Sequence, residues 1–567
     1  LTVAAAAAPI PAAHPFLEPD RLLPPTTTVT APNEALVNTT GGPVSGILNP
    51  RAREFRGIPF GAVGNIRWRR AVSPQPWAPA VLNGSTNGPA CMQQCSWAWG
   101  GCPPAQAEEC LYVNVFTPRA AAVPANTSSL PVIAWIHGGD YIFGHIGSPM
   151  YNASALAADG LVVVVTLQYR LGVWGTLYDG DAGGNVTGNY GLTDQIAALR
   201  WIAANAAAFG GDPTRVTVVG QSAGGISVAT LLASPSAAGL FAGAVVHSDP
   251  FAIPLHTPNG SIAAANTLAS KAGCGSTAGT PAGAACLLAL SPADLLTAQV
   301  AAAADIIAML PYALLYAGLP WSPTTGTPDL PLAPLDAFTD PAAYVADVPV
   351  MMGTVTDEVR GLVPTGFNLS SLEYSLFMLA IFGGDAGTAI LNHYPTPTPP
   401  PSNFYDAFCS VGTAGTFHCA VRNASLALSA RPGRKSSTYL YHYDHVLSWA
   451  PYFWGPNGTA CWDYVCHTAD VLLLFQPQYP ALNATYTPAE ASLASAMHTY
   501  WSNFAASGDP GAGGSGGAPV WPPLPFAGGV SDIPSLYLST SGITVLNATF
   551  DGAECAFWDA DVGYHPY

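Results

Sequence analysis

Charged side chains are scarce in this sequence. Asp, Glu, Lys and Arg together make up 9% of its 567 residues, and lysine occurs only at Lys271 and Lys435. The 17 basic residues are outnumbered by 34 acidic ones, which leaves a formal net charge of −17. Such a chain repels the phosphates of nucleic acid and the headgroups of anionic membranes, so we exclude both as partners.

Long apolar runs are also missing. Hydrophobic residues reach 49%, but many of them are alanine, and no uncharged apolar run is long enough to span a bilayer. Residues 1–35 are rich in Ala, Pro and Thr and are predicted to form a poorly ordered lead. Because the opening LTVAAAAAPIPAA lacks a basic segment, we interpret it as a mature N-terminus left after removal of a signal.

Cysteines and glycosylation sequons favour the secretory pathway. Four of the 11 cysteines cluster between Cys91 and Cys110 without nearby pairs of histidine, which favours disulfides over a zinc site. We therefore expect a secreted, extracellular protein with N-linked glycans. The N-x-S/T sequons are Asn38, Asn83, Asn126, Asn152, Asn185, Asn259, Asn368, Asn423, Asn457, Asn483 and Asn547.

The most informative stretch is Arg215–Ala233, RVTVVGQSAGGISVATLLA. Val216–Val219 is apolar on both faces, as in a strand buried in a parallel sheet. The turn Gly220–Gly224 has the pattern G-x-S-x-G, and a helix of small residues is predicted to follow. In a nucleophile elbow the serine of this pattern stands on a strained turn, with its hydroxyl exposed at the sheet edge. We therefore predict that Ser222 is a catalytic nucleophile.

Strand and helix patterns alternate along the chain. A helix is predicted from an N-cap at Thr193 through Ala208, where Gly210 and Gly211 end it. This alternation predicts an α/β fold with a mainly parallel sheet and helices on both faces, while residues 255–345 and 365–430 are predicted to cap it. The other predicted strands are Leu111–Phe116, Val132–Ile136, Leu161–Leu167, Ala242–Val246, Val348–Met352 and Ser437–Tyr443.

A serine nucleophile requires a base, an acid that orients the base, and donors for the oxyanion. The strand VPVMMG is followed by Asp357 and Glu358, and either carboxylate fits the spacing. The glycine-rich turn after Trp135, in WIHGGD, can aim backbone N–H groups into a site. Spacing alone does not choose the base among His393, His418, His442, His445, His467, His498 and His565.

Further motifs resemble those of the type-B carboxylesterase family, which includes the cholinesterases, bile-salt-activated and fungal lipases, and the neuroligins. The resemblance runs from about Gly41 to Trp558 and implies a single α/β-hydrolase domain over residues 36–567, after the lead of residues 1–35. The motifs are FRGIPF, RWRR, CMQQ, EECLYVNVF, WIHGGD, QYRLGVWG, GNYGLTDQ, FGGDPTRVTVVGQSAGG and CAFWD.

The resemblance implies specific site residues. The acid of the family is a glutamate in a GxxxDE-type turn, which falls on Glu358, and the histidine in CHTADVLLLF selects His467. Ser222 is the nucleophile, and a family serine that falls on Ser248 braces the Glu–His pair by hydrogen bonding. The implied oxyanion donors are the backbone N–H groups of Gly139, Asp140 and Ala223.

The resemblance also implies the disulfides Cys91–Cys110, Cys274–Cys286 and Cys419–Cys555. For the remaining cysteines we predict Cys95–Cys102 and Cys461–Cys466, which leaves Cys409 free.

Several residues depart from the family pattern. Asp140 stands where the family usually has Gly or Ala, and Asp249 stands where a glycine is frequent. Gln221 replaces a glutamate of the cholinesterases, which weakens the case for a cationic choline substrate. Trp99 falls near a choline-binding position, although packing is the favoured role, and Trp321 falls near the acyl pocket and is expected to limit acyl size.

The predicted function is a secreted serine carboxylic-ester hydrolase that cleaves a small-molecule ester through a Ser-His-Glu triad and an acyl-enzyme. No metal or cofactor is expected to be needed. The alternative is a non-catalytic extracellular adhesion or structural protein on an esterase scaffold, as in the neuroligins, and Asp140, Asp249 and the sequons motivate it. A homodimer or an extracellular protein partner is left open.

Overall fold

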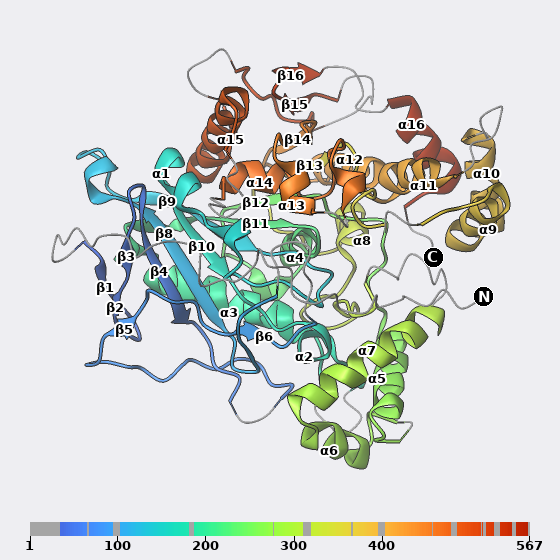
Figure 1. The fold of residues 1–567 in the computed structure, drawn as a ribbon, viewed down its shortest axis with the longest axis horizontal. Coiled ribbons are helices and arrows are strands. Elements are labelled where there is room, and N and C mark those ends of the chain that lie inside the picture. The colour runs from blue at the N-terminus through green and yellow to red at the C-terminus, as the bar shows by residue number, and fades with distance from the viewer. Residues whose placement is uncertain are drawn as a thin grey trace.

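The fold was analysed in a computed structural model of the chain (Figure 1). It describes residues 34–64, 67–94, 102–180, 186–275, 277–309, 319–363, 367–394, 403–455, 458–477, 485–511, 513, 518–526, 533–546 and 552–564.

An 11-stranded sheet forms the centre of the described chain. From β9 and β10 through β15 neighbouring strands pair in parallel, whereas β3, β4 and β8 at one edge and β16 at the other pair antiparallel. The strands lie in the order β16 (Gly542–Leu546), β15 (Ser535–Ser539), β14 (Thr438–Tyr443), β13 (Val350–Val355), β12 (Gly243–His247), β11 (Gly211–Gln221), β9 (Leu130–Ile136), β10 (Val163–Leu167), β8 (Tyr112–Pro118), β4 (Ala52–Pro59) and β3 (Ile47–Leu48).

Two small sheets lie beside the large one. Strand β2 pairs antiparallel with β1 and parallel with β5, and β6 pairs parallel with β7. Their bounds are β1 (Leu36–Thr39), β2 (Gly42–Ser45), β5 (Leu82–Asn83), β6 (Ala90–Cys91) and β7 (Gln106–Ala107).

Each face of the central sheet packs against its own layer of helices (Figure 1). Along β11 the buried side chain of Val218 belongs to one core cluster and that of the next residue, Val219, to the other, as the period of two in a strand requires. On the Val218 side lie α3 (Tyr190–Asn205), α4 (Ala223–Leu232), α8 (Pro334–Thr339) and α12 (Cys419–Ser429). On the Val219 side lie α1 (Ser154–Gly160), α13 (Ala450–Trp454), α14 (Ala469–Phe475) and α15 (Pro488–Ser507).

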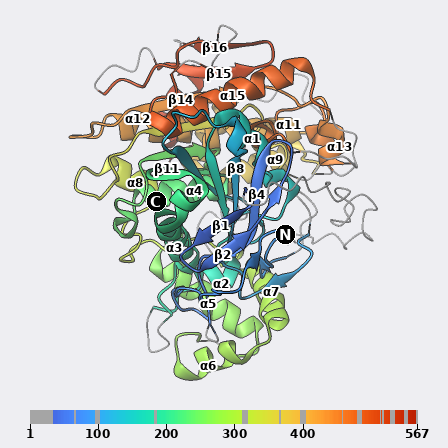
Figure 2. The same cartoon turned by 90° about the vertical axis from the view of Figure 1, so that its left-hand side faces the viewer.

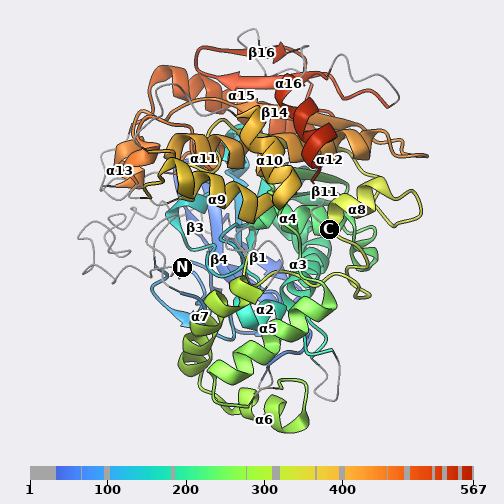
Figure 3. The ribbon, with the colours of Figure 1, turned by 90° about the vertical axis from the view of Figure 1, so that its right-hand side faces the viewer.

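Two helical excursions leave the sheet between consecutive strands. The first, between β12 and β13, extends away from the strands at the bottom of Figures 1 and 2 and contains α5 (Pro258–Lys271), α6 (Pro281–Ala289) and α7 (Pro292–Met309). The second, between β13 and β14, crosses the front of Figure 3 and contains α9 (Ser371–Phe382), α10 (Gly384–His393) and α11 (Tyr405–Gly412). The short helices α2 (Gly172–Thr176) and α16 (Gly552–Phe557) complete the set of described α-helices.

The predicted strands all fall on strands of the sheet, with shifts of a few residues at their ends. The prediction for the helix before β11 was wrong at its start. Helix α3 begins at Tyr190, so Thr193 lies inside it, and the N-cap is Asn189 with a φ of 55° and no side-chain cap. The end was predicted well, because Gly210 adopts a φ of 86° after a 3-10 turn over Ala206–Phe209. Residues 1–33 of the predicted lead lie outside the described residues.

Four disulfides join described cysteines: Cys91–Cys110, Cys274–Cys286, Cys419–Cys555 and Cys461–Cys466. These are the pairs expected above. Cys409 is free and buried, also as expected. Cys102 is disulfide-bonded, and its predicted partner Cys95 lies outside the described residues.

Within the described ranges, no single helix has the length and apolar composition needed to cross a bilayer. The bent pair formed by α6 and the first part of α7 meets those two criteria when its halves are taken together, with an angle of 118° between them.

Candidate active site

Ser222 occupies a tight turn between β11 and α4. Its φ of 60° and ψ of −126° are unusual for a residue with a side chain, as expected for a strained turn at a reactive residue. A Cβ on Gly220 would lie 2.2 Å from the carbonyl oxygen of Gly224, and a Cβ on Gly224 would lie 2.1 Å from that of Ile136. The turn therefore requires glycine at both flanking positions of the G-x-S-x-G pattern.

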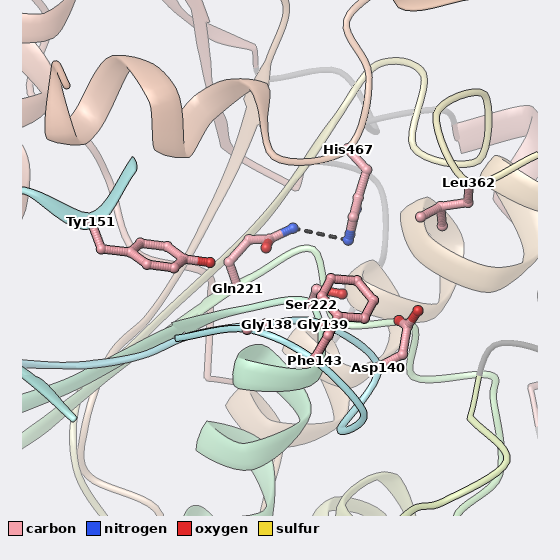
Figure 4. A pocket seen from close by; sticks show the side chains of 10 residues that line it. Gly138, Gly139, Asp140, Phe143, Tyr151, Gln221, Ser222, Leu362 and His467 are labelled. Atoms are coloured by element: carbon pink, nitrogen blue, oxygen red, sulfur yellow. Dashed lines mark hydrogen bonds between the residues drawn. The ribbon is translucent and has the colours of Figure 1, made fainter. Parts of the chain in front are cut away.

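Ser222 opens onto a cleft at the carboxyl ends of the parallel strands (Figure 4). Its side chain is 9% exposed, and its hydroxyl makes no hydrogen bond with the part of the chain that the structure describes. The other residues around the cleft are Gly138, Gly139, Asp140, Phe143, Gly144, Tyr151, Gln221, Leu362 and His467.

Glu358 and His467 form a buried pair beside the cleft. Oε2 of Glu358 lies 2.5 Å from Nδ1 of His467, and Oε1 of Glu358 accepts a hydrogen bond from the backbone N–H of Val355 at 2.9 Å. An ionised carboxylate can only accept, so this contact places the imidazole proton on Nδ1 and leaves a lone pair on Nε2. That lone pair is the feature a general base requires.

Asp357 and Glu358, which spacing could not separate, have different surroundings. The Asp357 carboxylate accepts a hydrogen bond from the backbone N–H of Val465 at 3.0 Å, and the Asp357 N–H donates to the Val465 carbonyl at 2.9 Å. Asp357 thus fastens the segment before His467 to the end of β13, while Glu358 contacts the imidazole itself.

The other candidate histidines lie elsewhere. His445 contacts Glu490 on α15, and the ring of His393 stacks on Phe557 with 3.8 Å between centroids. None of the described alternatives lines the cleft with Ser222. Contacts within hydrogen-bonding distance also join His418 to the Val355 carbonyl, His442 to Thr356 and His498 to the Leu474 carbonyl, and His565 lies outside the described residues.

The turn after β9 brings backbone amides next to the elbow. A Cβ on Gly138 would lie 2.7 Å from the Gln221 carbonyl oxygen, so the two segments approach closely. The N–H groups of Gly139 and Asp140 donate to no acceptor among the described residues. Ala223 is the first residue of α4, where an N–H has no acceptor within the helix. The amides of Gly139 and Asp140 thus lie in residues that line the cleft and have no acceptor among the described residues.

The Asp140 side chain lines the same cleft (Figure 4). Loss of contact with water disfavours the ionised carboxyl and raises the pKa of Asp140 to about 6, although the nearby His467 imidazole opposes this shift. The carboxyl forms no hydrogen bond or ion pair with a described residue. Asp140 thus brings a titratable acid to the place where the amides could bind an oxyanion.

Two other predicted residues, Ser248 and Trp321, do not line the cleft. The Ser248 hydroxyl is buried without a hydrogen-bond partner among described residues, so the expected brace to the Glu–His pair is not formed. Ser248 follows β12 with a φ of 49°, and its N–H donates to the Gly353 carbonyl instead. Trp321 is 3% exposed and belongs, like Trp174, to a separate core cluster. Trp99 lies outside the described residues.

A buried network supports the elbow from behind. His247 accepts the Ser222 N–H through its carbonyl at 3.0 Å, and its Nδ1 lies 2.7 Å from Oδ2 of Asp470. The hydroxyl of Tyr441 donates to the same carboxylate oxygen at 2.9 Å, and the indole N–H of Trp501 donates to Nε2 of His247 at 3.1 Å. Sequence reasoning missed this network, because four separate segments contribute to it.

Gln221 was noted in the sequence only as a replacement for a glutamate of the cholinesterases, and no role in the site was predicted for it. Its side-chain nitrogen Nε2 lies 2.9 Å from Nε2 of His467 (Figure 4).

No metal-binding group of three or more His, Cys, Asp or Glu side chains occurs among the residues that the structure describes.

Comparison with known proteins matches residues 33–558 to a model of the carboxylesterase family. An acylcarnitine hydrolase of Mus musculus is 29% identical over 504 residues, which cover 86% of this chain and 85% of that protein. The cAMP-regulated D2 protein of Dictyostelium discoideum is 31% identical over 483 residues, covering 84% and 85%. Among solved structures, a PNB esterase superposes with a TM-score of 0.74 at 27% identity, covering 92% of this chain and 99% of that one.

Proposed function

The chain belongs to the carboxylesterase family, has the α/β-hydrolase fold and is a carboxylic-ester hydrolase, and we propose that it acts through Ser222, His467 and Glu358. The observation that carries this proposal is the buried contact between Glu358 Oε2 and His467 Nδ1, at 2.5 Å, beside the cleft onto which Ser222 opens. The three residues come from three distant segments, and the sheet brings them to one end.

In the proposed first half-reaction, His467 Nε2 takes the proton of the Ser222 hydroxyl while the oxygen attacks the ester carbonyl carbon. The carbonyl oxygen becomes negatively charged and accepts hydrogen bonds from the N–H groups of Gly139, Asp140 and Ala223. The bond to the alcohol oxygen then breaks, and that oxygen leaves with the proton from His467. The product is an acyl-enzyme on Ser222.

The second half-reaction repeats these steps with water. His467 takes a proton from water as the water oxygen attacks the acyl carbon, and the same amides hold the charge. The bond to the Ser222 oxygen then breaks, Ser222 regains its proton from His467, and the carboxylic acid is released. Glu358 keeps the ring in the tautomer that can start each half-reaction and stabilises the imidazolium formed during it.

Labelling by a fluorophosphonate tests this mechanism. We expect the probe to add to Ser222 of the folded protein with loss of fluoride, as a single mass increment on the peptide that contains the elbow. Ser222→Ala should lose both labelling and turnover of p-nitrophenyl esters. Ser425→Ala is the matched control, because Ser425 is a buried serine on α12 that donates to the Val421 carbonyl away from the cleft. Ester turnover that survives in Ser222→Ala would refute the proposal.

We further propose that the protein is secreted and glycosylated. Four disulfides among the described residues fit an oxidising compartment. Asn38, Asn83, Asn126, Asn259 and Asn368 are exposed, so an oligosaccharide can be attached at these sequons without disturbing the core. Expression through a eukaryotic secretory pathway should give a medium-borne protein whose mass falls on treatment with peptide N-glycosidase. An unchanged mass would contradict glycosylation.

Asp140, Asp249 and the sequons motivated the non-catalytic alternative, but the family match and the esterase relatives favour an ester hydrolase. The proposed nucleophile, base and acid are all present, and the relatives named for an activity are hydrolases.

A further inference from the structure

The side chain of Gln221 contacts the ring nitrogen on which the proposed reaction depends. Gln221 is the last residue of β11, directly before Ser222, and is 3% exposed. Its Nε2 lies 2.9 Å from Nε2 of His467, while Glu358 holds the other ring nitrogen. Figure 4 shows the amide and the imidazole facing each other across the top of the cleft, above Ser222. Both ring nitrogens are thus engaged by side chains.

Chemistry fixes which side chain donates in this contact. Glu358 accepts a hydrogen bond from Nδ1–H, so Nε2 of the neutral ring carries a lone pair. Only a donor can face that lone pair favourably. The amide NH2 group of Gln221 is such a donor. The Ser222 hydroxyl has no hydrogen-bond partner among described residues. The Gln221 amide instead occupies the lone pair of Nε2, to which the serine hydroxyl must donate when the reaction starts.

We propose that Gln221 is a positioning residue that holds His467 as a neutral base and yields its place to Ser222 when substrate enters the cleft. This inference rests on the proposed function. The amide serves this purpose because it donates without carrying charge. A carboxylate at the same position could only accept, so it would favour the protonated imidazole and remove the base at mildly acidic pH.

Two carboxyl groups lie close to the imidazole. Among described residues, the Glu358 carboxylate faces it from the turn after β13, and the Asp140 carboxyl lies within electrostatic range from the turn after β9. The Phe417 ring covers a further side, with 5.2 Å between ring centroids. Asp470, on the helix after His467, is already engaged by His247 and Tyr441. Replacing the Gln221 amide by a charged group therefore changes the electrostatic environment of His467 Nε2 directly.

The test compares Gln221→Glu, which introduces an acceptor with charge, and Gln221→Met, which keeps the length and removes the hydrogen bond. All variants are made in the Asp140→Asn background, so that the titration of Asp140 does not overlap that of the base. The readouts are kcat and KM for a p-nitrophenyl ester between pH 4.5 and 9. In addition, 15N NMR of the imidazole reports its tautomer, and active sites are counted with the fluorophosphonate.

In Gln221→Glu we expect the acid limb of the kcat/KM profile to move to higher pH by about one unit or more, with activity recovering on the alkaline side. In Gln221→Met we expect kcat/KM to fall about threefold to tenfold on the plateau, with the 15N resonance of Nε2 displaced. A merely structural glutamine would lower stability in both variants without moving the limb or the resonance.

The two proposals fail in different ways. If the unmodified protein is not labelled and hydrolyses no ester, the proposed function fails. If it is labelled and active, while Gln221→Glu keeps the acid limb and Gln221→Met keeps the Nε2 resonance, the positioning role of Gln221 is overturned.

Discussion

Asp357 and Val465 are joined by two hydrogen bonds in opposite directions. The N–H of Asp357 donates to the Val465 carbonyl at 2.9 Å, and the N–H of Val465 donates to the Asp357 carboxylate at 3.0 Å. Each residue stands shortly before a member of the buried pair, Glu358 or His467. These hydrogen bonds link the loop after β13 to the loop after β14, and so help to fix the position of Glu358 relative to His467.

Replacing the proposed acid should stop the reaction while leaving the fold intact. Glu358→Gln keeps the size of the side chain, but its single amide oxygen cannot accept from both the Val355 N–H and Nδ1–H of His467. With the NH2 group facing Nδ1, the ring no longer holds the required tautomer. We expect kcat to fall about 10³- to 10⁴-fold, measured with a p-nitrophenyl ester. Asp357→Asn is the matched control, because its amide oxygen can still accept from Val465, and its kcat should fall about tenfold at most. Equal losses in the two variants would contradict the assignment of the acid.

The disulfide Cys461–Cys466 should affect catalysis as well as stability. It lies directly before His467 and packs on the turn that carries Glu358, since a Cβ on Gly361 would lie 3.1 Å from Sγ of Cys461. Removing it in Cys461→Ser/Cys466→Ser should lower the free energy of unfolding by about 2 kcal/mol and kcat by about tenfold.

The control for that disulfide is Cys274→Ser/Cys286→Ser, which opens a bridge in the excursion formed by α5–α7. We expect a stability loss of similar size, about 2–3 kcal/mol, with kcat unchanged at 25 °C. The prediction is wrong if both double variants lose activity in proportion to stability alone.

Asp140 should make the reaction progressively less efficient as pH rises. Its pKa is raised to about 6, so the carboxyl is neutral below that pH and negative above it, close to the proposed oxyanion. The ratio of kcat/KM for Asp140→Asn over the unmodified protein should be near one at pH 5 and rise to about tenfold by pH 8, since like charges repel across the cleft.

A pH-rate series for both proteins measures this ratio. Asp305→Asn serves as the control, because Asp305 pairs with Lys271 on the exposed helices α5 and α7, and its ratio should stay near one throughout. A ratio for Asp140→Asn that does not change with pH would show that the carboxylate does not act on the reaction.

Glu490 should contribute stability that depends on pH. Burial opposes its charge, but hydrogen bonds from His445, Ser448 and Thr487 lower its pKa from 4.5 to about 2. Because the pKa is depressed in the folded state, this stabilisation is complete above pH 4.5 and is lost as the pH falls toward 2. Glu490→Gln should therefore cost about 2 kcal/mol at pH 7 and much less near pH 2, measured by urea unfolding. A cost that is constant with pH would contradict this.

Much of the fold could be predicted because its signals are local. The apolar runs that became β9, β11 and β13 are buried on both faces and need no distant contact to be recognised. The start of α3 could not be predicted from Thr193, since the actual first turn depends on Asn189 in the left-handed region, where its side chain donates to the distant Thr324 carbonyl at 2.8 Å.

The candidate site could be predicted only in part. Ser222 carries its own local pattern, but spacing left Asp357 and Glu358 equivalent, and only the resemblance separated them. Ser248 and Trp321 show the opposite limit: the resemblance implied a role for each side chain at the site, yet the direction of a side chain depends on packing that the sequence does not reveal. The contact between Gln221 and His467 also required coordinates.

The order of the strands has a consequence for synthesis on the ribosome. In the proposed mechanism the reactive alcohol on the turn after β11 is made well before the carboxylate that follows β13, and the imidazole comes later still, after β14. A nascent chain therefore carries a nucleophile without its base for much of translation. Products of premature termination before residue 467 would be inert toward esters. Ester hydrolysis can therefore begin only once the C-terminal segments have been made and have folded onto the sheet.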